Sequence, residues 1–463
     1  MNNTRLWALN ISAATLVAMP AMSAPQHYGV DQPQLAAASQ QLNALIEQAL
    51  ATDANRQQYF AQSQAMRETA IASATLMDPK LKVGIGGLPV DSFKFDDDPM
   101  TNISIGLMQQ FERGDTLSLQ QKKNNLQADG SALQIAAREL DVANRITKIW
   151  LELGYQQVAA GILRENQRLM IEMERFIATN YSLGKSEAQD LLNAQLQVSK
   201  LDEKLQANTQ IQRRLLSQLS EWLGSDWLNT HQSLTTSNRL LWPRLNAALA
   251  SQSKSSGNQH YTLLAQHPMV KMADTSIAVG QTQVELAEQA YLPQFGVEVM
   301  YGYRQANNMR GEPASDLVSA YLTMDIPLFT DNRQDKNKAA AQYQVGAAKS
   351  QKDLLLAQMN AKVNALLVDK QNLELRLARY QDTLLSQAKA RTQAVERGYQ
   401  NNTAQFNDVI SATSDELNLI LEQQRLVTDL SIVKSNLAAL LNRFGYQAAA
   451  PTLRPDTQPH TQH

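Results

Sequence analysis

Residues that could support catalysis or metal binding are scattered in this sequence. The 463-residue chain contains no cysteine, which excludes disulfides, thiolate metal sites and cysteine nucleophiles. Its six histidines form no helical pair of the kind that binds zinc. Residues 84–87 (GIGG) resemble part of a phosphate loop, but the full fingerprint and its helix are missing. We therefore expect no catalytic residue, no metal site and no cofactor.

Three consecutive carboxylates, Asp96, Asp97 and Asp98, stand between two predicted strands. We expect them to form the solvated tip of a hairpin, with a cation site as the alternative. The 15 methionines are dispersed along the chain, and methionine fills gaps in a core more often than it binds copper.

Charge and hydropathy exclude two broad classes of protein. A formal net charge of −2 gives no polycationic surface, so nucleic acid is not expected as a partner. Residues 1–23 predict an export signal, because Arg5 precedes an apolar run over 6–19 and small residues at Ala21 and Ser23. A membrane anchor is the alternative. Beyond this segment no apolar run is long enough to cross a bilayer, which excludes a helical membrane protein.

The mature chain repeats itself at a constant offset of 218. The aligned pairs are Phe111 with Phe329, Tyr181 with Tyr399, Asp190 with Asp408, Ala194 with Ala412 and Gly224 with Asn442. Upstream, Pro79 matches Pro293 at an offset of 214. The offset stays constant from residue 111 to residue 224, without an insertion. This indicates that the structure requires the spacing, as it would for long helices that must end at the same height.

Each half shows the same order of helix, strand, loop, strand, very long helix, turn and long helix. Residues 331–397 contain no proline and only one glycine, Gly346. Apolar residues follow at intervals of three, four and seven, which predicts a coiled-coil seam. At 1.5 Å per residue such a helix is roughly 100 Å long. An ordinary coiled-coil protein is the alternative on these helices alone.

Two hairpins argue against that alternative. Apolar and polar residues alternate over 295–303 and 318–328, and less strongly over 81–85 and 103–107. Strands of about nine to eleven residues with one apolar face are typical of transmembrane barrels. Four strands cannot close a barrel, and open edges are not tolerated in lipid. The chain must therefore oligomerise, as a dimer with eight strands or a trimer with twelve.

The residues at the second helix turn match a known family. Gly398–Tyr399 and Thr403, followed by Asp408, Val409, Ile410 and Ala412, together with the duplication, resemble the TolC-like outer-membrane efflux proteins. The resemblance covers residues 35–445. It implies a homotrimer in the cell outer membrane that extends into the periplasm: a mainly α fold in which four β-strands per chain close a 12-stranded transmembrane β-barrel above a coiled-coil α-helical barrel. It also implies a periplasmic adaptor protein and an inner-membrane RND pump as partners, and no enzymatic activity.

A finer resemblance points to the outer-membrane components of heavy-metal efflux systems of the cobalt-zinc-cadmium and copper-silver type. It is carried by short motifs in and around the first hairpin: Asp78-Pro79, GLPV at 87–90, DPMT at 98–101 and FERGD at 111–115. Copper-system members are often lipidated on an N-terminal cysteine, which this chain lacks. Export of heavy-metal cations is the expected function. Export of drugs or other organic compounds, or a soluble periplasmic scaffold, are the alternatives.

The family resemblance also indicates where the channel would narrow. Acidic residues near the second helix turn ring the closed opening in this family, and Asp408 occupies the matching position, with Asp190 as its repeat partner. A capping role at a helix N-terminus is the alternative for both. Tyr399 could hydrogen-bond across helices. Four turn residues, Gly184, Lys185, Asn402 and Thr403, are expected to face the adaptor, and Gly184 and Asn402 to supply a positive φ.

These patterns divide the chain into five segments. They are a signal peptide (1–23), a first repeat (24–229), a linker (230–257), a second repeat (258–446) and a disordered tail (447–463). The expected hairpins span about 80–111 and 294–328, and the helix turns about 180–186 and 398–404.

Overall fold

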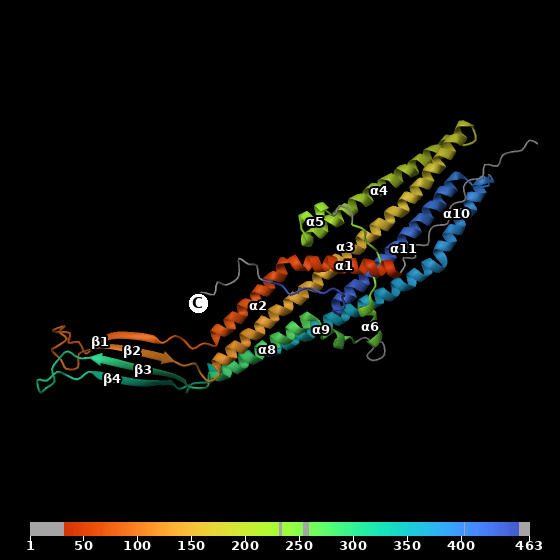
Figure 1. The fold of residues 1–463 in the computed structure, drawn as a ribbon. Coiled ribbons are helices and arrows are strands. Elements are labelled where there is room, and N and C mark those ends of the chain that lie inside the picture. Colours follow the sequence, from red (N-terminus) through yellow and green to blue (C-terminus); the bar gives the residue numbers. More distant parts are fainter. Residues whose placement is uncertain (1–31, 231–233, 253–258, 402, 453–463) are drawn as a thin grey trace, which may run out of the picture.

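The structure, a computed structural model, describes residues 32–230, 234–252, 259–401 and 403–452. The molecule is elongated, with a small sheet at one end and long helices over the rest of its length (Figure 1). The predicted signal peptide lies outside the described residues.

Both halves of the chain contain long helices and one hairpin. The first half contains α1 (Gln32–Thr52), α2 (Ala54–Ser73), β1 (Lys80–Gly86), β2 (Asn102–Gln110), α3 (Thr116–Ser182), α4 (Ala188–Leu223) and α5 (Ser225–Thr230). The second half contains α6 (Pro243–Gln252), α7 (Tyr261–Leu264), α8 (Pro268–Gln289), β3 (Gln294–Tyr303), β4 (Leu317–Asp325), α9 (Gln334–Arg379), the π-helical turn η1 (Tyr380–Leu384), α10 (Leu385–Gln400) and α11 (Phe406–Leu440). The predicted mainly helical class with four strands per chain is confirmed, while closure into a trimeric barrel stays a prediction.

The helix bounds repeat with the spacing found in the sequence. The helices α3 and α9 begin at residues 116 and 334, and α4 and α11 begin at 188 and 406. Both pairs keep the offset of 218 that relates the two halves of the sequence. Helix α3 has 67 residues, which corresponds to roughly 100 Å. Its counterpart is one continuous helix formed by α9, η1 and α10, and the π-helical turn in it was not predicted.

The helices that lead into the two hairpins begin with equivalent side-chain caps. In α2 the cap is Asp53, whose carboxylate accepts a 2.7 Å hydrogen bond from the Arg56 N–H. In α8 it is His267, whose Nδ1 accepts a 3.2 Å bond from the Met269 N–H. Both side chains are buried. Burial lowers the pKa of His267 to about 4, so its ring is neutral at pH 7 and can accept this bond.

The four strands form one antiparallel sheet in the order β1-β2-β3-β4. The inner pair, β2 and β3, joins the two repeats, with Ile105 opposite both Val83 of β1 and Tyr301 of β3. Because alternate residues point to opposite faces, this register fixes which side chains share a face.

The main hydrophobic core lies where the helices meet in the middle of the molecule. Its fully buried side chains include Ile46, Leu50, Trp150, Leu219, Leu245 and Leu437. Leu245 and Leu234 come from the segment that links the repeats. The core therefore ties the linker to helices from both halves of the chain.

Two residues of the segment predicted as a tail, Gln447 and Ala449, form hydrogen bonds with the first two helices. The Gln447 N–H donates a 2.8 Å hydrogen bond to Glu47 of α1, and Arg56 of α2 donates to the Ala449 carbonyl. The proposed tail therefore starts after these contacts, and its residues 453–463 lie outside the described part of the chain.

Candidate functional site

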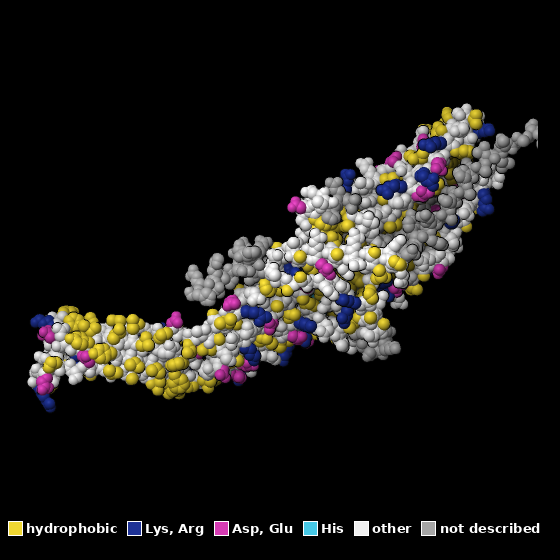
Figure 2. Space-filling model, viewed as in Figure 1, with side chains coloured by type: hydrophobic (Ala, Val, Ile, Leu, Met, Phe, Trp, Pro, Cys, Tyr) yellow, Lys and Arg dark blue, Asp and Glu magenta, His cyan; other side chains and the backbone are white. Residues whose placement is uncertain are grey.

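One face of the sheet consists of apolar side chains, apart from Gln109 at the end of β2 near the helices. It comprises Leu81, Val83, Ile85, Ile103, Ile105, Leu107, Phe295, Val297, Val299, Tyr301, Tyr303, Val318, Ala320, Leu322 and Met324. Most of them are exposed, and Val83 and Leu322 are each 71% exposed. Figure 2 shows the resulting concentration of hydrophobic side chains over the strand end of the molecule. A patch of this extent is unusual for a soluble monomer and marks a surface that is covered by lipid or by another chain.

Aromatic residues stand at both ends of this apolar face. Phe295 lies at the helix end of β3, and Tyr301 and Tyr303 lie toward the hairpin tip. At 3.3 Å per residue, Phe295 and Tyr303 are about 26 Å apart. Transmembrane barrels have an apolar band of about 25 Å between two girdles of aromatic residues. The dimensions of the apolar face are therefore those of a membrane-facing barrel wall.

The opposite face is polar and contains ion pairs. Lys82 of β1 contacts Glu298 of β3, with Nζ 2.8 Å from Oε2. Arg113, which follows β2, forms an ion pair with Asp325 at the end of β4. Polar groups of this kind do not belong in lipid, so the two faces of the sheet suit different surroundings.

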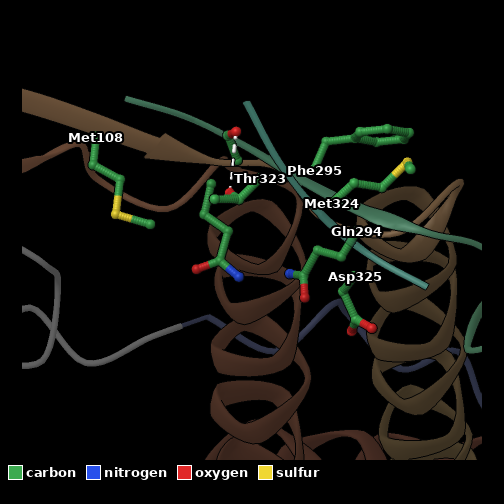
Figure 3. Close-up of a pocket in the computed structure, with 8 residues that line it drawn as sticks. Met108, Gln294, Phe295, Thr323, Met324 and Asp325 are labelled. Atoms are coloured by element: carbon green, nitrogen blue, oxygen red, sulfur yellow. Dashed lines mark hydrogen bonds between the residues drawn. The ribbon is translucent and has the colours of Figure 1, made fainter. Parts of the chain in front are cut away.

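An open hollow of about 220 Å³ lies on this polar face, where the sheet approaches the helices. Figure 3 shows Gln294, Thr323 and Asp325 around it, and Gly296, which has no side chain, leaves the space. The Thr323 hydroxyl donates a 3.2 Å hydrogen bond to the Gly296 carbonyl. Amide, hydroxyl and carboxylate groups make this a surface that water can wet.

The sheet has two open edges. Strands β1 and β4 each pair on one side only, so their outer N–H and C=O groups are available to another strand. Since β1 and β4 run in opposite directions, β4 of one chain could extend the antiparallel order with β1 of the next.

The two helix turns lie together at the end of the molecule opposite to the sheet (Figure 1). In the first turn Gly184 has a φ of +68°, as predicted, and the Lys185 N–H donates a 2.8 Å bond to the Asn180 carbonyl. Lys185 is exposed. In the second turn the Thr403 N–H and hydroxyl both donate to the Gly398 carbonyl, at 2.7 and 3.0 Å. Asn402 lies outside the described residues.

Asp408 occupies a capping position. It is the third residue of α11, and its carboxylate accepts a 3.0 Å hydrogen bond from the Gln405 N–H, while the Gln405 side chain accepts from the Asp408 N–H. This reciprocal capping box satisfies two helix N–H groups. Asp408 is exposed, so its carboxylate also contributes a negative charge to the surface of the tip. Asp190, at the same place in α4, forms no such box.

Tyr399 joins the two hairpin tips. Its ring packs 6.0 Å from that of Phe406, in a cluster with Ile177 of α3 and Ala194 of α4. Burial raises the pKa of Tyr399, the Ser186 side chain lowers it through a hydrogen bond, and the charge of Asp190 raises it. Asp190 and Tyr399, which come from different repeats, are thus neighbours.

Several contacts at the tips were not predicted from the sequence. The Asn193 side chain of α4 donates a 3.1 Å bond to Asn407 of α11, and Phe406 fills the space between the hairpins. The aromatic residue directly after the second turn was the available signal for Phe406. For Asn193 the pattern offered none, because the partner lies 214 positions away.

Comparison with solved structures identifies the fold. The chain is similar to the outer membrane protein VceC from Vibrio cholerae, with 15% identity and a TM-score of 0.68 over 89% of this chain and 97% of that one. It is similar to the transmembrane channel protein CusC, with 15% identity and a TM-score of 0.70 over 92% and 98%. It is also similar to the Campylobacter jejuni outer membrane channel CmeC, with 12% identity and a TM-score of 0.67 over 97% and 95%.

Neither a family model nor a curated protein matches the sequence. At 12 to 15% identity the structural likeness establishes the fold, which is that of the TolC-like outer-membrane channels.

The described residues contain neither a cluster of metal ligands nor a membrane-spanning helix. None of their His, Asp and Glu side chains gathers in a group of three or more that could hold a metal ion. Among the described helices, none combines the length and the apolar character needed to cross a membrane.

Proposed function

We propose that this chain is the subunit of an outer-membrane exit duct in a tripartite efflux system. The observation that carries the proposal is the exposed apolar face of the sheet, about 26 Å long at 3.3 Å per residue and bounded by Phe295 and Tyr303. Lipid would cover this face, and the polar face with Lys82 and Glu298 would line water.

The open edges of the sheet support assembly as a homotrimer. Three copies give twelve strands, which close a barrel with room for a water-filled lumen, whereas two copies give eight strands and a lumen that side chains fill. Closure removes the unpaired edge of β1 and of β4, which lipid would not tolerate. The long helices then continue the barrel across the periplasm as a tube.

The duct would work passively with an inner-membrane RND pump and a periplasmic adaptor. The turns at Gly184, Lys185, Asn402 and Thr403 would be the surface offered to the adaptor. The cluster around Tyr399 and Phe406 holds the hairpin tips of one chain together, and untwisting of these tips on docking would open the channel.

Asp408, Asp190 and Tyr399 are the proposed constriction residues. Three symmetry copies of the exposed Asp408 carboxylate around a narrow pore would attract cations and repel anions. Asp190 and Tyr399 would act differently, as neighbours that fix one hairpin tip to the other.

Heavy-metal cations are the proposed cargo, supported by the motifs around the first hairpin. Organic compounds are the second candidate, because the polar sheet face carries both Lys80 and Lys82 and so has no excess of negative charge. A strain that lacks the gene, tested for sensitivity to metals and to drugs, separates the two. Increased sensitivity to drugs alone would replace the metal assignment.

The duct itself is tested by fractionation and mass determination. The full-length protein is expressed, and the inner and outer membranes are separated. The molecular mass of the detergent-solubilised species is then determined by light scattering or native mass spectrometry. A trimer in the outer membrane is the expected result. A protein that is extracted without detergent as a monomer or dimer would contradict the proposal and favour a soluble periplasmic scaffold.

A further inference from the structure

The polar face of the sheet carries four charged side chains. They are Lys80 and Lys82 of β1, Glu298 of β3 and Asp325 of β4. Asp325 is paired with Arg113, and Glu298 is paired with Lys82. In the described part of the chain Lys80 has no carboxylate partner. The unpaired charge of this face therefore depends on the contact between Lys82 and Glu298.

This contact bridges two strands that are not neighbours. Lys82 belongs to β1 and Glu298 to β3, and β2 lies between them. Strands are about 4.8 Å apart and Glu298 is offset from Lys82 by two residues along the strands, so the side chains must span about 12 Å. The contact runs diagonally across β2, because the β2 residue opposite Lys82 is Gly106 and the one opposite Glu298 is Met108. Lys82 Nζ reaches both carboxylate oxygens, at 2.9 Å from Oε1 and 2.8 Å from Oε2.

Glu298 is buried although it lies on the polar face. It is 9% exposed, between Met108 of β2 and Tyr321 of β4 in the register of the sheet. The Lys82 side chain, in contrast, is 51% exposed. A carboxylate among such neighbours is costly unless a cation compensates it. The Lys82 ammonium is therefore held over the Glu298 carboxylate. The positive charge of Lys82, which would otherwise face water, is neutralised by this ion pair.

We propose that Glu298 determines the ion selectivity of the barrel by neutralising Lys82 across strand β2. The inference rests on the proposed duct, in which the polar face lines the lumen. In a trimer, three paired lysines contribute no net charge to the wall, and three copies of Lys80 remain. Loss of Glu298 would free three further positive charges at one level of the lumen and favour anions.

The test is the reversal potential of purified full-length trimers in planar bilayers under a KCl gradient. The variants are Glu298→Gln, the double variant Lys82→Gln with Glu298→Gln, and Asp97→Asn. Glutamine keeps the shape of Glu298 and can still accept a hydrogen bond from Lys82. Asp97→Asn makes the same change in net charge in the exposed hairpin loop and is the matched control.

We expect Glu298→Gln to increase the chloride-to-potassium permeability ratio about twofold or more. The double variant should return to the wild-type ratio, and Asp97→Asn should not move from it. A ratio in Glu298→Gln equal to that of Asp97→Asn would overturn the inference, as would an increase that persists when Lys82 is also replaced.

Failure of the proposed duct looks different, because the wild-type protein would then form no channel and no outer-membrane trimer. If Glu298→Gln does not assemble, a second experiment tests the ion pair in the wild-type trimer, whose lysines are acylated with an amine-reactive reagent. Lys82 should react several-fold more slowly than Lys80 in the same strand. Equal rates would contradict the neutralised pair.

Discussion

A charge placed on the apolar face of the sheet should prevent assembly of the barrel. Leu322 lies near the middle of β4, opposite Val297, and is 71% exposed. If lipid covers this face, Leu322→Arg places a guanidinium in the hydrocarbon layer. The cost is about 2–4 kcal/mol at mid-bilayer, equivalent to roughly a 30- to 700-fold change in the folding equilibrium of each chain. Three copies in one trimer would each carry this cost.

The assay compares two variants in the same strand. Ser319 lies three positions before Leu322 and points to the polar face, so Ser319→Arg adds the same charge toward the lumen. Trimers are quantified in the outer-membrane fraction by electrophoresis without heating, against total expressed protein. We expect Leu322→Arg to lose most of its trimer and Ser319→Arg to keep it. Normal yield of Leu322→Arg with loss of Ser319→Arg would refute the assignment of the two faces.

Three further perturbations test the helix tips and the core. Asp408→Asn keeps an acceptor for the Gln405 N–H but removes three charges from the proposed constriction, so cation selectivity in planar bilayers should fall. An unchanged reversal potential would contradict the role of Asp408 in the constriction. Tyr399→Phe removes the hydroxyl that bonds Ser186 and keeps the packing on Phe406, so closed channels should leak more current; conductance equal to wild type would show that the bond does not hold the tip. His267 has its pKa lowered to about 4 by burial, so between about pH 6.5 and 4 the unfolded chain binds a proton that the folded chain does not. Stability should therefore fall by about 3 kcal/mol as the pH drops through this window. His267→Asn keeps a cap acceptor and should show a smaller fall in the thermal unfolding midpoint than wild type; identical pH profiles would contradict the assignment.

The two repeats share their helix bounds but differ in side-chain interactions. The caps at positions 53 and 267 are equivalent, yet Asp53 forms a 2.8 Å ion pair with Arg138, while His267 is neutral and buried. At the tips, Asp408 caps its helix and Asp190 faces Tyr399. The two aspartates therefore occupy equivalent helix positions but make different contacts.

The duplication, the length of the helices and the two-faced strands can all be predicted from the amino-acid sequence alone. These features depend on local periods: heptad spacing and the absence of proline predict the long helix formed by α9, η1 and α10, and alternation of apolar residues predicts a strand such as β3. The constant offset between the repeats predicted that both long helices end level, and the structure has them end at Ser182 and Gln400. Such patterns need no knowledge of which elements pack together.

The contacts between distant side chains, in contrast, follow only from how the elements pack. Lys82 reaches Glu298 only because the sheet order places a single strand, β2, between them, and Tyr399 lies near Asp190 only because the two hairpins pack side by side. Both pairs lie more than 200 positions apart in the chain, and neither helical nor strand periodicity carries information over that distance. The direction of a side chain follows from local geometry, but its partner follows from packing.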